Sequence, residues 1–199
     1  MSAILESLAN SLDSASIKKM SNELGEDQEK TTNAIGAALP VLLGALKRNA
    51  VAPQGAQSLL GALSNDHDGS VLDRLGDFLS NRDYEQPRGG GSILNHVFGG
   101  NLSRVEKGVS QSSGLRDAAS SKLLKMLAPL VLGAVGKQVR SQNLGAGDLS
   151  GYLNKESEQL ERKDKKFSLL GKFLDQDGDG DFDFNDIAKL GVGLLFKRK

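Results

Sequence analysis

Apolar residues recur along the first two thirds of the chain at the three- and four-residue spacing of amphipathic helices. The pattern predicts short helices over 3–12 and 14–24, followed by a long helix led by Asp27. Gly25 is expected to end the second helix in a left-handed turn. In the long helix, the residues from 34 to 47 (AIGAALPVLLGALK) are apolar on nearly every side, so we expect them to lie at the centre of a domain.

The chain contains a second stretch of the same kind, LLKMLAPLVLGAVGK at 123–137. Aligning Pro40 with Pro129 sets an offset of 89 residues (129 minus 40). Self-similarity at a fixed long offset is typical of a duplicated supersecondary unit. We therefore interpret 1–153 as a duplicated all-helical core with halves of about 1–80 and 92–153. The same offset superposes Gly44 on Gly133, Gly25 on Gly114, and Ile4-Leu5 on Ile93-Leu94.

The second half predicts helices in the same order as the first. A proline inside a helix removes one backbone hydrogen bond and crowds the preceding turn, so both long helices are expected to kink, at Pro40 and Pro129. Small residues nearby, such as Gly44 and Gly133, should let these two helices approach closely. No run of alternating apolar and polar residues is long enough to predict a β-strand, so we predict an all-α fold. The remaining expected elements are helices over 54–63, 70–79, 93–98, 102–112, 145–153 and from Leu115 onward, with a linker over 80–91.

Several separate motifs resemble those of a known family. They are LGEDQEKTTNAIGAALPVLLGAL, DHDGSVLDRLGDFL, GGGSILNHVFGGNLSRVEKGVSQSSGL and KMLAPLVLGAVG. Over roughly Ser2 to Leu153, the chain resembles the bacterial YidB-like family, domain of unknown function 937. The resemblance implies an all-helical bacterial protein, and it implies no mechanism because that family has no assigned activity.

Six aspartates crowd into the twelve residues 175–186, DQDGDGDFDFND. The spacing matches the calcium loop of an EF-hand, in which positions 1, 3, 5, 7, 9 and 12 face the ion. Gly180 stands at position 6, where the sharp turn needs a left-handed residue. Carboxylate oxygens at alternating positions suit calcium, and their mutual repulsion should couple folding of this segment to ion binding. The expected ligands are Asp175, Asp177, Asp179, Asp183 and Asp186, with Asp181 contributing its backbone carbonyl.

Position 12 of this loop departs from the EF-hand pattern. Asp186 stands where a bidentate glutamate is usual, so the affinity is open and magnesium is expected to compete. Apolar residues on both sides predict flanking helices, which makes 167–199 a single EF-hand-like helix-loop-helix. The sequence has no second such loop, so the lone hand is expected to pack on the helical core or on another chain. The charged segment 154–166 is interpreted as an exposed linking helix.

Two histidines are weaker candidates for a site. Asp66, His67 and Asp68 lie in a loop before a helix, where they could form a weak metal site, a proton relay or an enzyme centre. We favour the alternative that this loop is a turn capping the next helix. His96 lies on a short apolar segment and is expected to be a packing residue rather than a ligand. The glycines of 89–92 (GGGS) lack the lysine and strand of a phosphate-binding loop and are interpreted as a hinge.

Composition narrows the function classes further. The chain has no cysteine, which excludes disulfides, thiolate metal sites and a cysteine nucleophile. The net charge is zero, but removing the six loop aspartates leaves 19 acidic against 25 basic residues (25 minus 6), a mild surplus that does not favour a nucleic-acid surface. The sequence shows neither a secretory leader nor a run of about twenty apolar residues, so we expect a cytoplasmic protein without membrane association.

These patterns together lead us to expect a non-enzymatic, calcium-binding helical protein. Calcium is expected to be mainly structural, or else to regulate an interaction by ordering the two flanking helices. The alternative is an interaction scaffold that self-associates through its glycine- and alanine-rich helices, with calcium incidental. The expected partner is a protein, which includes a second copy of the chain, and no small-molecule substrate is indicated.

Overall fold

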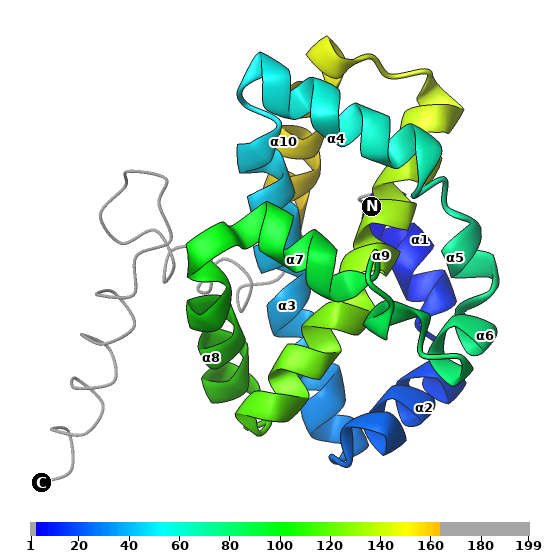
Figure 1. Cartoon of the computed structure of the whole chain (residues 1–199), viewed down its shortest axis with the longest axis vertical. Helices are drawn as coiled ribbons and strands as arrows, with labels where there is room; N and C mark the ends of the chain where they lie inside the picture. The colour runs from blue at the N-terminus through cyan, green and yellow to red at the C-terminus, as the bar shows by residue number, and fades with distance from the viewer. Residues whose placement is uncertain (1–2, 164–199) are drawn as a thin grey trace, which may run out of the picture. The chain divides into compact units, whose positions relative to one another are not determined.

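The computed structural model describes the backbone of residues 3–163 and the side chains of residues 3–159 (Figure 1). In this part of the chain every regular element is helical and no strand is present, so the predicted all-α fold is confirmed. By its contacts the chain divides into two units, Met1–Gln159 and Leu160–Lys199. The elements that begin in the first unit are α1 (Ala3–Ser11), α2 (Ser14–Leu24), α3 (Gln28–Asn49), α4 (Pro53–Asn65), α5 (Ser70–Asp73), α6 (Leu75–Ser80), η1 (Asp83–Glu85), α7 (Gly90–Phe98), η2 (Gly99–Asn101), α8 (Leu102–Ser113), α9 (Asp117–Gln142) and α10 (Ala146–Lys163).

Local signals explain where the early helices begin and end. The carboxylate of Asp13 accepts the amide N–H of Ser16 at 2.7 Å, which satisfies one of the unpaired donors at the start of α2. Gly25 ends that helix with a φ of 63°, in the left-handed region that favours glycine. Gly114 ends α8 in the same way, with a φ of 74°. Both glycine stops lie at the positions that the sequence predicts.

Helix α9 forms the centre of the first unit. It contacts α1, α2, α3, α4, α5, α7 and α8, and Figure 1 shows it running between them. Sixteen of its 26 residues are buried, against eleven of the 22 residues of α3. The two long apolar helices therefore differ in their surroundings, because α9 is enclosed on nearly all sides while α3 keeps one face toward the surface.

Length and composition alone would let α9 cross a membrane. It is the one helix among the described residues that passes this test. In the structure, 78% of its most apolar eighteen-residue window is buried inside the protein. This burial is what the central helix of a packed helical domain requires, so the apolar character of α9 is accounted for by the core.

Two glycines allow neighbouring backbones to come close to α9. A Cβ atom placed on Gly90, the first residue of α7, would lie 1.8 Å from the backbone oxygen of Lys125. That oxygen also lacks its ordinary helical donor, because Pro129 stands four residues later and has no N–H. A Cβ on Gly136 would lie 1.9 Å from the backbone oxygen of His67. Only a hydrogen fits in these two directions, so each glycine is required by packing.

Three sequence expectations differ from the structure. The segment 70–79, predicted as one helix, is divided into α5 and α6 at Arg74, whose φ and ψ are −119° and 29°. The break lets Leu72 on one side and Phe78 on the other both reach the core. The predicted linker 80–91 carries Tyr84, which is fully buried and packs against the ring of Phe78 with centroids 5.9 Å apart.

The third difference concerns the end of the described region. The predicted helix 145–153 and the predicted exposed linking helix from residue 154 form one continuous helix, α10. Within it Glu156 is buried, with 5% of its surface exposed. A charged sequence pattern was therefore a poor guide at this position, because one acidic residue of the segment turns toward the core.

Candidate functional site

The predicted calcium ligands lie outside the described residues. Asp175, Asp177, Asp179, Asp181, Asp183 and Asp186 all follow residue 163, so their site stays a prediction from the sequence. Within residues 3–159 no group of three or more histidine or acidic side chains is placed so that it could hold a metal ion.

The loop that carries His67 is tied to its neighbours by structural contacts. One carboxylate oxygen of Asp68 accepts the amide N–H of Ser70, the first residue of α5, at 3.0 Å, and the other pairs with Arg140 of α9 at 3.2 Å. The hydrogen bond from Ser70, assisted by the charge of Arg140, lowers the pKa of Asp68. The backbone N–H of His67 donates to Ala62 at the end of α4. These contacts match a turn that starts a helix.

Burial decides the charge state of His67. Its side chain is half-buried, and desolvation lowers the pKa of its imidazole below the usual 6.5, although the charges of Asp66 and Asp68 act in the opposite direction. The ring is therefore neutral at pH 7. His96 lies on α7, where it is exposed, so the expectation that it packs in the interior does not hold.

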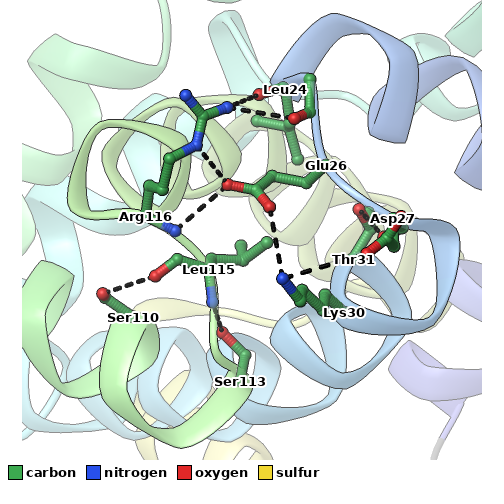
Figure 2. A network of polar contacts seen from close by, with 10 residues as sticks. Leu24, Glu26, Asp27, Lys30, Thr31, Ser110, Ser113, Leu115 and Arg116 are labelled. Carbon is green, nitrogen blue, oxygen red and sulfur yellow. Dashed lines mark hydrogen bonds and ion pairs between the residues drawn. The ribbon is translucent and has the colours of Figure 1, made fainter.

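Glu26 and Arg116 join the two loops that precede the long helices (Figure 2). Arg116 donates to one carboxylate oxygen of Glu26 from its side-chain Nε at 2.7 Å and from its backbone N–H at 3.2 Å. Its terminal nitrogen also donates to the backbone oxygens of Leu24 and Gly25, at 3.1 and 3.0 Å. These oxygens are unpaired carbonyl groups at the end of α2, where a cation is favoured. We call this arrangement the Glu26–Arg116 clasp.

The clasp is fixed from both sides. Lys30 of α3 approaches the second carboxylate oxygen of Glu26 at 3.9 Å. On the other side, the hydroxyl of Ser110 donates to the backbone oxygen of Leu115 at 2.7 Å (Figure 2). The hydrogen bonds from the side chain and backbone of Arg116 lower the pKa of Glu26, which keeps its carboxylate ionised. The residues in contact lie 90 positions apart, so the clasp was not visible in local sequence patterns.

A second polar cluster gathers around Glu23 of α2. One of its carboxylate oxygens accepts from the ammonium of Lys122 at 3.0 Å and from the hydroxyl of Tyr84 at 3.4 Å, and Arg82 lies at 3.3 Å. The hydrogen bond from Lys122 lowers the pKa of Glu23. Burial acts to lower the pKa of Lys122, but its contacts with Glu23 and Tyr84 outweigh burial and raise it. Acid and base are thus both held in their charged forms.

This direction of the shifts argues for a stabilising role of the Glu23 cluster. A general base or a nucleophilic lysine needs a pKa moved toward neutrality. Here the pKa of Glu23 moves down and that of Lys122 moves up, while burial raises the pKa of Tyr84. The cluster is therefore suited to holding α2, η1 and α9 together rather than to moving protons.

A third polar contact joins the two ends of the described chain. Glu156 of α10 accepts the backbone N–H of Ile4 at 3.1 Å, and both residues are buried. Burial and the nearby charge of Glu156 raise the pKa of Tyr152, one turn earlier on α10, to about 12. No local sequence signal identifies Ile4 as the partner of Glu156, because the two residues lie 152 positions apart.

Comparison with known proteins places the chain in a family. A family model described as bacterial protein of unknown function (DUF937) matches residues 6–138. The chain belongs to this family. The DUF937 match covers most of the helices described above and ends inside α9, so α10 and the aspartate loop lie beyond it. No curated protein and no solved structure matches the chain. Membership in DUF937 therefore supplies no activity.

Proposed function

We propose that this DUF937 protein is a non-enzymatic, calcium-binding helical protein of the bacterial cytoplasm. The observation that carries the proposal is the spacing of the loop 175–186, with aspartates at positions 1, 3, 5, 7, 9 and 12 and Gly180 at position 6. The ion would be held by oxygen ligands alone, which suits calcium and, more weakly, magnesium. We expect calcium to act mainly as a structural ion for 167–199, or else to regulate a protein interaction.

The distribution of charge supports a protein partner over a nucleic acid. Residues 1–159 carry 16 basic and 17 acidic residues, and 160–199 carry 9 basic and 8 acidic ones, which together account for the 25 of each sign. The basic surplus outside the aspartate loop therefore belongs to 160–199, which contains 9 basic residues and, apart from the six loop aspartates, only 2 acidic ones. The helical core of 1–159 is close to neutral. A near-neutral core offers no electrostatic attraction for a phosphate backbone.

The alternative function is a scaffold that self-associates through its small-residue helices, with calcium incidental. The small residues of α9 are already used inside the core, since Gly133 lies against Val71 and Gly136 against His67. The half-exposed face of α3, which carries Pro40 and Gly44, is what this alternative would need. Molecular size measured with calcium and with a chelator separates the two: a shift on chelation favours calcium-linked assembly, and constant self-association favours the scaffold.

We also infer that the core of residues 1–153 is duplicated. What supports this is that α2 and α8 end at glycines 89 residues apart, while Pro40 of α3 and Pro129 of α9 are separated by the same offset. A bend at each proline stays a prediction. The YidB-like likeness rests on the sequence motifs alone.

The test of the proposed function is calorimetric titration of calcium into chelator-treated protein. We expect binding in the micromolar range for the wild type and its loss in Asp175→Ala with Asp179→Ala. A matched control is the double variant Asp66→Ala with Asp73→Ala, which removes two exposed aspartates from the core and should bind as the wild type does. Absence of binding heat in the wild type, or equal binding by the Asp175/Asp179 variant, would refute the proposal.

A further inference from the structure

The turn between α4 and α5 lies in close contact with the backbone of α9. A Cβ atom added to Gly136 would lie 1.9 Å from the backbone oxygen of His67. One added to Gly133 would lie 2.7 Å from a side-chain methyl of Val71 and 3.5 Å from the Cα atom of Gly69. Gly133 and Gly136 are three residues apart, so they share one face of α9. The turn is therefore seated on this face from His67 to Val71.

The α4 end of this turn is held without a charged contact. The backbone N–H groups of Asp66 and His67 both donate to the backbone oxygen of Ala62, at 3.0 and 3.1 Å. The side chain of His67 is half-buried at this end. A charged imidazolium in the same place would lose part of its hydration, which disfavours the protonated ring. The closed turn therefore fits a neutral His67.

The α5 end is held by charge instead. The carboxylate of Asp68 accepts the N–H of Ser70 at 3.0 Å and pairs with Arg140 of α9 at 3.2 Å. The hydrogen bond from Ser70 and the charge of Arg140 lower the pKa of Asp68, so this carboxylate stays ionised over the range in which histidine titrates. Gly69, with a φ of 99°, separates the two ends in a conformation that glycine adopts readily.

Several charges surround the turn, and burial outweighs those that favour a protonated ring. The charged residues of the turn and of the neighbouring helix segments are Asp66 and Asp68 of the turn, Glu6 of α1, Asp73 of α5, and Lys137 and Arg140 near the end of α9. Helix α4 carries none. Desolvation lowers the pKa of His67 below 6.5, against the opposite effect of Asp66 and Asp68. The stability that the neutral ring gives the closed turn is therefore complete above pH 6.5 and is lost as the pH falls below it.

We propose that the turn formed by residues 66–70 is a pH switch, in which protonation of His67 releases the α4 end of the turn from Gly136 while the Asp68–Arg140 pair keeps the α5 end on α9. The charged ring gains water only when the α4 end lifts, and Gly69 lets that end move by itself. Local opening of this kind costs less free energy than unfolding of the whole domain. The switch belongs to the described helical unit and does not depend on ion binding by the aspartate loop.

The first test is an NMR titration of the imidazole of His67. The chain has two histidines, so His96→Gln, which replaces an exposed side chain of α7, leaves His67 as the only imidazole to be observed. Its midpoint should lie below pH 6.5. A midpoint at or above 6.5 would overturn the proposal, because protonation would then not favour the open turn.

The second test is amide hydrogen exchange of the full chain at pH 7.5 and 5.5, expressed as protection factors to correct for the direct effect of pH. In the wild type and in His96→Gln, protection of the amides at positions 66 and 67 should fall about threefold at the lower pH. The amide of Ser70 and those of α9 should keep their protection, which separates movement of the α4 end from unfolding. In His67→Gln, whose side chain stays neutral, all of these amides should be insensitive to the change.

Three results of the exchange experiment would overturn the pH switch. They are constant protection at positions 66 and 67 in the wild type, an equal loss of protection in His67→Gln, and a loss at Ser70 as large as that at Asp66. If His67→Gln does not fold, the wild type and His96→Gln decide the question. The loss of protection at Asp66 must then follow the titration of the His67 ring, and a loss centred at a different pH would refute the link between them.

Discussion

Replacing Gly136 with alanine gives the sharpest test of how tightly α9 is packed. In an uncrowded helix, exchange of glycine for alanine stabilises the fold by about 0.5–1 kcal/mol, because alanine has less backbone freedom to lose. At position 136 the new Cβ would lie 1.9 Å from the oxygen of His67 and 3.2 Å from that of Leu63. Both atoms belong to backbone, so no side-chain rotation can relieve the contact.

The size of the effect follows from these distances. Cβ contacts shorter than 3.0 Å are essentially never seen, so α9 and the His67 backbone must separate by at least 1.1 Å (3.0 minus 1.9). Overpacking in a dense core costs about 1–3 kcal/mol, and a contact between two backbones belongs at the upper end of this range. After the gain from alanine is subtracted, we expect Gly136→Ala to lower the free energy of unfolding by about 2 kcal/mol.

Urea denaturation followed by circular dichroism measures this change. Gly61→Ala is the matched control, because Gly61 lies inside α4 with no atom within 4 Å of its added Cβ, and it should stabilise the fold by about 0.5–1 kcal/mol. The two variants should therefore shift the denaturation midpoint in opposite directions, with the slope unchanged. A midpoint for Gly136→Ala at or above that of the wild type would show that the approach of α9 to the His67 loop is not tight.

Two further predictions concern ionisable groups. Because Arg116 holds the pKa of Glu26 below its ordinary 4.5, this carboxylate contributes stability that is complete above pH 4.5 and is lost as the pH falls through the lower folded value. The unfolding free energy of Glu26→Gln should consequently depend less on pH below 4.5 than that of the wild type. Arg116→Ala should weaken this pH dependence in the same way. If the unfolding free energies of the variants and of the wild type fall in parallel as the pH is lowered, the clasp is ruled out. The two tyrosines of this tryptophan-free chain should both stay mostly neutral at pH 10, because burial raises the pKa of Tyr84 and raises that of Tyr152 to about 12. The midpoints of the tyrosinate absorbance should therefore lie above pH 10 for both rings, and the fold should begin to lose stability in the same range. Ordinary midpoints near 10 for both rings would contradict the buried placement.

Local sequence signals predicted the helices well. The glycines that end α2 and α8, and Pro53 at the start of α4, each act within one helical turn of the backbone that they control. Such signals are complete in the sequence itself. For this reason the positions of these boundaries follow from the order of the residues alone.

Contacts between distant segments could not be predicted in this way. Tyr84 lies in a stretch rich in proline, glycine and charge, yet it is buried because η1, which carries it, packs against α6, α7 and α9 and its ring lies beside Phe78. Glu156 looks like one of many exposed charges until the start of α1 is placed next to it. The Asp66–Asp68 loop was interpretable as a turn, whereas its pairing with Arg140 depends on how α9 packs. The ligands of the predicted calcium loop lie outside the described residues, so their arrangement stays a prediction.

The central place of α9 has a consequence for the order in which this protein folds on the ribosome. Helices α1 to α5, α7 and α8 all pack on α9 and all leave the ribosome before it. At roughly 5–20 residues per second, the 26 residues of α9 take about 1–5 s to add, and until they emerge the apolar faces of the earlier helices lack their common partner. The nascent chain must therefore wait for residues near 142 before its core can close, and α1, the earliest of the described helices in chain order, receives its cap, the carboxylate of Glu156, only when α10 follows.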